Sequence, residues 1–128
     1  MTPILIEIGP GELCDRLSIL SLKAEHVKRG RLAASIGETL DRLKSLRSGL
    51  PFDAVTARLE TDLAEVNRDL WEVEDALHAA ECRETFDDSY IALARKVQLL
   101  NKQRCRLKAA IDEALEVTGS VEVKIYGK

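Results

Sequence analysis

Residues 59–82, LETDLAEVNRDLWEVEDALHAAEC, and residues 93–114, LARKVQLLNKQRCRLKAAIDEA, decide the fold of this chain. In both segments a stripe of mainly apolar residues recurs at alternating spacings of four and three, which is about one every 3.5 residues and is typical of helices packed along their length. The segment between them, roughly residues 82–87, is long enough only for an antiparallel return, so we expect a long helical hairpin. The stripes are Leu59, Leu63, Val66, Leu70, Val73, Leu77, Ala80 and Leu93, Val97, Leu100, Arg104, Leu107, Ile111, Ala114.

Two shorter amphipathic helices are predicted upstream of the hairpin. The first begins near Glu12 and ends at Gly30, and the second ends at Gly49 and Pro51. Their apolar residues follow the helical spacing, which predicts that these faces are buried. The buried residues of the first helix are Leu13, Leu17, Leu20, Ala24 and Val27, and those of the second are Ile36, Leu40, Leu43, Leu46 and Leu50.

Aspartates in N-cap positions mark the start of both hairpin helices. Asp53 precedes the third helix, which we expect to run to about residue 82, and Asp87 or Asp88 precedes the fourth. We expect the fourth helix to continue to about Thr118, where Gly119 ends it.

The two ends of the chain read as short strands. Residues 4–8 (Ile-Leu-Ile-Glu-Ile) and residues 121–125 (Val-Glu-Val-Lys-Ile) are rich in β-branched residues. A ribbon of two strands is marginally stable alone and needs a helix beneath it. The predicted fold class is therefore mainly α: an antiparallel four-helix bundle built on the long hairpin, with a small two-stranded β ribbon formed by the chain termini.

Composition fits one domain over residues 1–128, with 45% hydrophobic residues and a net charge of −3. Acidic and basic residues alternate along the chain, which gives no indication of nucleic-acid or membrane binding. Three cysteines without paired spacing argue against a disulfide framework and favour a reducing, cytoplasmic setting. The apolar N-terminal stretch is too short for a signal peptide, and no segment reaches the length of a membrane span.

A row of polar and aromatic residues follows the apolar stripe of the third helix. Equal rise along two antiparallel helices places Asn67 level with Asn101 and Glu74 level with Arg95. Such residues either fix the register of the helices or line a ligand groove. The row consists of Asn67, Trp71, Glu74, His78 and Glu81, and the groove candidates are Asn67, Trp71, Glu74, Arg95, Asn101 and Arg104.

Two pairs of carboxylates stand three residues apart on predicted helices, Glu12 with Asp15 and Glu72 with Asp75. Each pair has the geometry to offer two carboxylates to one Mg²⁺, as in all-α nucleotide pyrophosphohydrolases. Solvated ion pairing along a helix explains the same spacing. The alternative function that these pairs support is a Mg²⁺-dependent hydrolase of nucleotide or sugar-nucleotide substrates.

The turn Gly9-Pro10-Gly11 precedes the first helix, where exposed backbone N–H groups can hold a phosphate. Glu12 in the first turn already complements the positive end of the helix and would repel an anion. The glycines are also explained by a tight turn. Both interpretations of this turn remain open.

Gly11-Glu12-Leu13 and Asp15-Arg16-Leu17 stand at the start of the chain, and its centre carries Leu70-Trp71, Glu74-Asp75, Leu93-Ala94-Arg95, Val97, Asn101 and Arg104. In the order of these residues the chain resembles an uncharacterised bacterial family of helical proteins, a domain of unknown function, over nearly its whole length. The resemblance implies no activity, substrate or cofactor. We therefore expect a binding or assembly module for protein–protein interaction, without catalysis and without a cofactor.

The difference in helix length predicts self-association. The hairpin helices should each span about 45 Å, whereas the two upstream helices reach only about 27 Å. The shorter pair cannot cover the longer one, and a bare apolar strip is normally buried by a partner. Because two-fold pairing is the commonest solution, we expect a homodimer.

Overall fold

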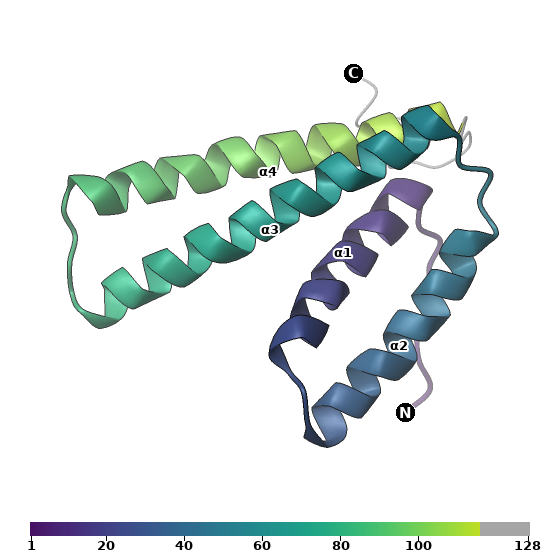
Figure 1. Cartoon of the computed structure of the whole chain (residues 1–128), viewed down its shortest axis with the longest axis horizontal. Coiled ribbons are helices and arrows are strands. Elements are labelled where there is room, and N and C mark those ends of the chain that lie inside the picture. Colours follow the sequence, from purple (N-terminus) through teal and green to yellow (C-terminus); the bar gives the residue numbers. More distant parts are fainter. Residues whose placement is uncertain (116–128) are drawn as a thin grey trace.

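The computed structural model describes residues 1–115 and contains four helices in that range: α1 (Pro10–His26), α2 (Gly30–Ser48), α3 (Ala54–Cys82) and α4 (Asp88–Ala114). The helices α3 and α4 form the long antiparallel hairpin, α1 packs against one end of it, and α2 packs on α1 (Figure 1). The backbone of α1 lies close to those of all three other helices, whereas the backbone of α2 lies close to α1 alone. The predicted helical bundle is confirmed.

The N-caps of both hairpin helices are the predicted aspartates. The Asp53 carboxylate accepts a hydrogen bond from the backbone N–H of Thr56 at 2.8 Å, and that of Asp87 accepts one from Tyr90 at 3.2 Å. These side chains satisfy donors that the first turn of a helix leaves without partners. At its other end α4 stops at Ala114 rather than near Thr118.

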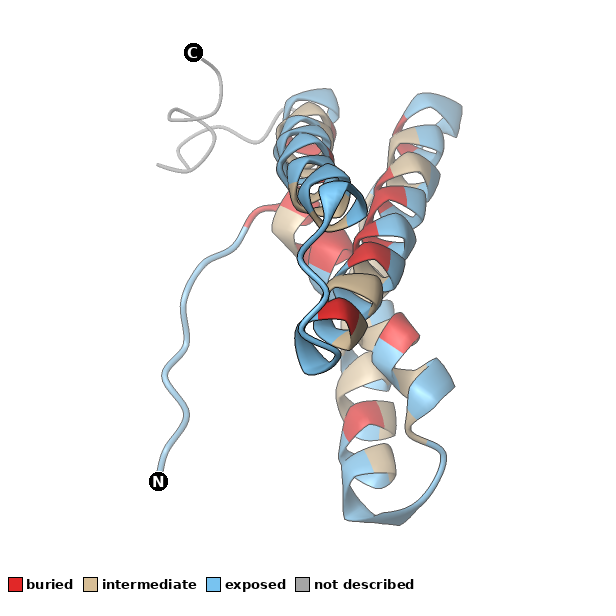
Figure 2. Cartoon of the chain, turned by 90° about the vertical axis from the view of Figure 1, so that its left-hand side faces the viewer, coloured by how far each residue is buried: buried red, intermediate tan, exposed pale blue. Residues whose placement is uncertain are grey.

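The hydrophobic core follows the seam between α3 and α4, as the two apolar stripes predict. Figure 2 shows the buried positions on the inner faces of the helices. One cluster lies along the seam, and a second lies where α1 joins the hairpin and includes Cys14 of α1. The first is built on Val66, Leu70, Val73 and Leu100, and the second on Cys14, Leu63 and Ile111.

The predicted β ribbon is wrong. Residues 4–8 form no strand and run away from the helices (Figure 2), with Ile4 and Leu5 almost fully exposed. β-branched composition favours an extended backbone, but a strand forms only where a second strand supplies hydrogen-bond partners. Residues 1–115 supply none. The strand predicted at residues 121–125 lies outside the described residues.

The α2 helix is less buried than its apolar spacing predicts. Ile36 is buried, but Leu46 is 63% exposed, and Leu40 and Leu43 are only half-buried. Because α2 packs mainly on α1, a single neighbour covers only part of its apolar face.

Candidate functional site

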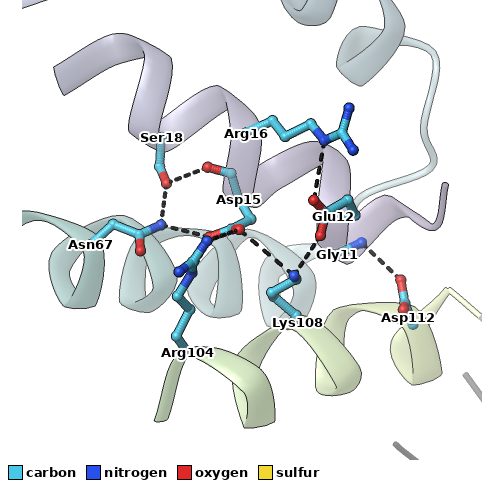
Figure 3. A network of polar contacts seen from close by, with 9 residues as sticks. All are labelled: Gly11, Glu12, Asp15, Arg16, Ser18, Asn67, Arg104, Lys108 and Asp112. Carbon is cyan, nitrogen blue, oxygen red and sulfur yellow. Dashed lines mark hydrogen bonds and ion pairs between the residues drawn. The ribbon is translucent and has the colours of Figure 1, made fainter. Parts of the chain in front are cut away.

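The site is built around Asp15, which projects from α1 into the junction with α3 and α4 (Figure 3). Its side chain is 2% exposed. Arg104 of α4 binds both carboxylate oxygens, with Nε 2.9 Å from Oδ1 and Nη2 2.6 Å from Oδ2. Two parallel charge-assisted hydrogen bonds are the strongest way to hold a buried carboxylate.

Asn67 of α3 completes the ring of donors around Asp15. Its Nδ2 donates to Oδ1 of Asp15 at 2.9 Å and to the Ser18 hydroxyl at 2.5 Å. The Ser18 hydroxyl in turn donates to the backbone carbonyl of Asp15 at 2.9 Å. One carboxylate of α1 is thus tied to both helices of the hairpin.

Lys108, one turn beyond Arg104 on α4, joins a second carboxylate to the network. Its ammonium group forms an ion pair with Glu12 and lies 3.7 Å from Oδ2 of Asp15. Glu12 also accepts a hydrogen bond from Nε of Arg16 at 3.1 Å. The two carboxylates therefore face two partly buried cations, Arg104 and Lys108, so the junction is close to neutral.

Asp112 of α4 caps the N-terminus of α1. It is almost fully buried, and its Oδ1 accepts a hydrogen bond from the backbone N–H of Gly11 at 2.8 Å. The N-cap residue Gly9 has no side chain to do this, and a Cβ there would lie 2.7 Å from the same oxygen. The N-terminus of α1, which follows the turn Gly9-Pro10-Gly11, therefore binds a carboxylate of the chain itself.

The backbones of α1 and α4 approach each other closely at Gly11. A Cβ on Gly11 would lie 2.2 Å from the backbone carbonyl oxygen of Lys108. Only glycine fits this contact, so Gly11 determines how closely α1 can approach the hairpin. A tight turn alone does not explain this glycine.

The pKa values of the network follow from burial and charge. Burial alone would raise the pKa of Asp15, but hydrogen bonds from Arg104 and Asn67 outweigh it, so the pKa lies below its usual value. Burial also opposes the charged form of Glu12, but its bond to Lys108 lowers the pKa. These groups are therefore fully charged at neutral pH.

Asp112 behaves in the opposite way. Burial raises its pKa, and neither the Gly11 N–H nor the nearby Lys108 compensates fully. Asp15 differs from Asp112 in its donors, because only Asp15 is bound by a bidentate guanidinium and by a side-chain amide.

The chain matches a family of unknown function, DUF6165, over residues 4–122. The chain belongs to this family. The resemblance to an uncharacterised family is confirmed at this level. Comparison with curated proteins and with solved structures gives no match. Within residues 1–115 no helix is long and apolar enough to cross a membrane.

The four carboxylates predicted as metal ligands lie in two different environments. Glu12 and Asp15 are held by Lys108 and Arg104, whereas Glu72 and Asp75 are exposed on α3. In the described part of the chain no three His, Cys, Asp or Glu side chains are grouped so that they could hold a metal ion. A divalent cation at Asp15 would have to displace the guanidinium of Arg104.

The six groove candidates are also divided by the structure. Asn67 and Arg104 meet at Asp15, while Trp71 stacks on His26 with ring centroids 4.7 Å apart. The remaining three, Glu74, Arg95 and Asn101, are exposed on the hairpin.

A second polar cluster lies between α1, α2 and α3. Arg47 binds Glu60 through two hydrogen bonds of 2.7 and 3.0 Å and lies over the Phe52 ring. Burial raises the pKa of the adjacent Cys14 thiol to about 12, and the Glu60 carboxylate adds to the shift. A thiol that stays protonated is a poor nucleophile. An open cavity of about 310 Å³ adjoins these residues.

Sequence reasoning missed Lys108, Asp112 and Ser18 as members of the network. One signal was present: Arg104 occupies a position of the apolar stripe, so its guanidinium had to be near the core. A buried guanidinium requires an acidic partner. The spacing does not show which of the many carboxylates that partner is.

Proposed function

We propose that this member of DUF6165 is a cytoplasmic binding or assembly module without catalytic activity, and that it associates with itself as a homodimer. One observation carries the proposal. The polar and aromatic contacts of α1 with the hairpin extend to Trp71 on α3, through His26, and to Arg104 on α4, through Asp15. The remainder, residues 72–103, which we call the arm, projects beyond α1 and α2 (Figure 1).

The arm has the composition of an interaction surface. Two helices bury one shared stripe and leave the flanks of that stripe open. Phe86, Ile91 and Leu99 are each more than half exposed there. Exposed large apolar side chains on a projecting element are available for contact with another protein.

The state of the polar groups also supports a module rather than an enzyme. A catalytic acid, base or nucleophile needs an accessible group with free hydrogen-bonding capacity. In the junction, the carboxylates of Glu12 and Asp15 are held by cations, and the buried Cys14 thiol is protonated at neutral pH. These contacts are those of residues that hold helices together.

The experiment measures mass and ligand binding on the same protein. Light scattering over the micromolar range should give twice the chain mass, and Mg²⁺ with nucleotides or sugar nucleotides should leave the melting temperature unchanged. A ligand that binds only the native state must raise that temperature. A monomeric mass at every concentration would remove the proposed self-association, and a saturable rise with Mg²⁺ would favour the hydrolase.

A further inference from the structure

Charge is separated between the two helices of the hairpin. Residues 60–82 of α3 contain eight acidic residues and one arginine, whereas residues 89–111 of α4 contain six basic residues and no acidic one. The acidic residues are Glu60, Asp62, Glu65, Asp69, Glu72, Glu74, Asp75 and Glu81, and the basic ones are Arg95, Lys96, Lys102, Arg104, Arg106 and Lys108.

Most of these charges have no ion-pair partner within residues 1–115. On α4 only Arg104 and Lys108 are paired, and both bind carboxylates of α1. On α3 the paired acidic residues are Glu60 and Asp62, both near the start of the helix, and the one arginine, Arg68, pairs with Glu25 of α1. The unpaired charges are Glu65, Asp69, Glu72, Glu74, Asp75 and Glu81 on α3 and Arg95, Lys96, Lys102 and Arg106 on α4.

One flank of the hairpin presents both charges next to each other. On α3 and α4 the residues Asn67, Trp71, Arg104 and Lys108, which contact α1, lie on one side of the apolar stripe. Helical geometry places a second set of residues on the other side of each stripe. We call this set the back face. It comprises Glu65, Asp69, Glu72 and Ala76 of α3 and Ala92, Lys96, Leu99, Gln103 and Arg106 of α4, all exposed except the half-buried Ala76.

We propose that the back face binds the back face of a second copy of this chain about a two-fold axis parallel to the helices, so that α3 of each copy packs against α4 of the other. This proposal rests on the self-association proposed above. A surface that carries an acidic column beside a basic column is complementary to its own image after this rotation. An axis across the helices would instead place α3 on α3, with acid against acid, and would be opposed by repulsion.

The positions of the charges along the helix axes agree with this arrangement. The Tyr90 hydroxyl bonds to Glu81, so positions whose numbers sum to about 170 lie level across the hairpin. Rotation about an axis parallel to the helices does not change a residue's position along that axis, so residues that are level within one copy are also level between the two copies. Glu65 then lies level with Arg106 of the second copy, and Glu72 lies within one turn of its Lys96.

The back face also carries an apolar residue. Leu99, which is 62% exposed, lies near the middle of this surface, between Lys96 and Arg106 of α4. A contact there would remove its side chain from water.

Charge reversal tests the arrangement with matched controls. Lys96→Glu and Glu72→Lys change the back face, whereas Lys102→Glu and Glu74→Lys make the same charge changes on exposed positions of the same helices outside it. Each back-face variant should weaken dimerisation by about tenfold or more, because the two-fold axis repeats the change, and each control should stay within about twofold of the parent chain. Sedimentation equilibrium measures these constants.

Mixing the two back-face variants gives the decisive result. Glu72 lies within one turn of Lys96 of the second copy, so in a heterodimer of Lys96→Glu with Glu72→Lys the two reversed charges face each other and the other contact is that of the parent chain. The equal mixture should therefore recover dimerisation. If Glu72→Lys strengthens the dimer instead, α3 faces α3 and the arrangement is wrong. A dimer that is indifferent to all four variants would overturn this inference while leaving self-association standing; a monomeric parent chain would overturn both.

A distance measurement tests the direction of the two copies independently of affinity. Cys82 is exposed at the loop end of α3, and Cys14 is buried and unreactive, so a Cys105→Ser chain takes a spin label at Cys82. The proposed axis brings both loops to the same end. The opposite arrangement adds about 40 Å along the helix axis, because Cys82 lies about 14 residues from the middle of α3. A long distance would overturn the proposal.

Discussion

The two ends of the hairpin share one sequence pattern, but their charged residues lie in different environments. Where α1 covers α3 and α4, which we call the base, charged residues turn inward and bind one another. In the arm, outside residues 83–88, the charges remain exposed and are separated by sign, acidic on α3 and basic on α4. Arg104 and Arg95 illustrate this, since both belong to α4 but only Arg104 binds a buried carboxylate. The role of a charged residue on such a helix depends on whether a third helix covers it.

The largest contrast between base and arm is expected from arginine removal. Arg104→Ala leaves the buried Asp15 carboxylate without its bidentate partner and should reduce the free energy of unfolding by about 3 kcal/mol. Arg95→Ala removes an exposed side chain and should change it by less than about 0.5 kcal/mol. Urea denaturation measures both. Equal effects of the two substitutions would show that the base does not depend on this ion pair.

Two glycines test the close contact between α1 and α4. Gly11→Ala places a Cβ against the Lys108 carbonyl and should destabilise the fold by about 2 kcal/mol, because the helices must separate. Gly37→Ala on α2 meets nothing within 4 Å and should stabilise it by about 0.5 to 1 kcal/mol through helix propensity. Opposite signs in thermal unfolding are the expected result; a neutral Gly11→Ala would contradict the contact.

Lowering the pH should destabilise the base of the hairpin before it destabilises the arm. The pKa values of Asp15 and Glu12 are lowered in the folded chain, so their contribution to stability is complete above their unfolded pKa values near 4 and is lost as pH falls through the folded values. Arg104→Ala removes the main partner of Asp15 and should flatten this pH dependence. Hydrogen exchange at several pH values measures the stability of the base and of the arm separately. If the stability of the base depends on pH equally in Arg104→Ala and in the parent chain, Asp15 is not the group responsible.

The smallest effect is expected at Asp112. Its raised pKa means that the charged form costs folding free energy at neutral pH, and this cost disappears below the unfolded pKa near 4. Asp112→Asn keeps an oxygen that can accept from Gly11 and should match or slightly exceed the stability of the parent chain at pH 7. At pH 3 the two chains should be equal. A substantial loss at pH 7 would show that the carboxylate charge itself holds the N-terminus of α1.

Much of the architecture was predictable because it depends on local chemistry. The heptad stripes, the short return between α3 and α4 and the capping aspartates Asp53 and Asp87 are all read from neighbouring residues. Each of these features is present in the structure. Local patterns failed at residues 4–8, where strand formation requires a partner from elsewhere in the chain.

What only the tertiary structure decided is the pairing of residues far apart in the chain. The sequence itself determined that Arg104 lies in the apolar stripe, but Asp15, its partner, is 89 residues away. The role of Gly11 likewise depends on Lys108, and that of Asp112 on the start of α1. Helical periodicity specifies which face of a helix is buried, but a buried charge is stabilised by whichever opposite charge packing brings within hydrogen-bond distance, and packing is a property of the whole chain.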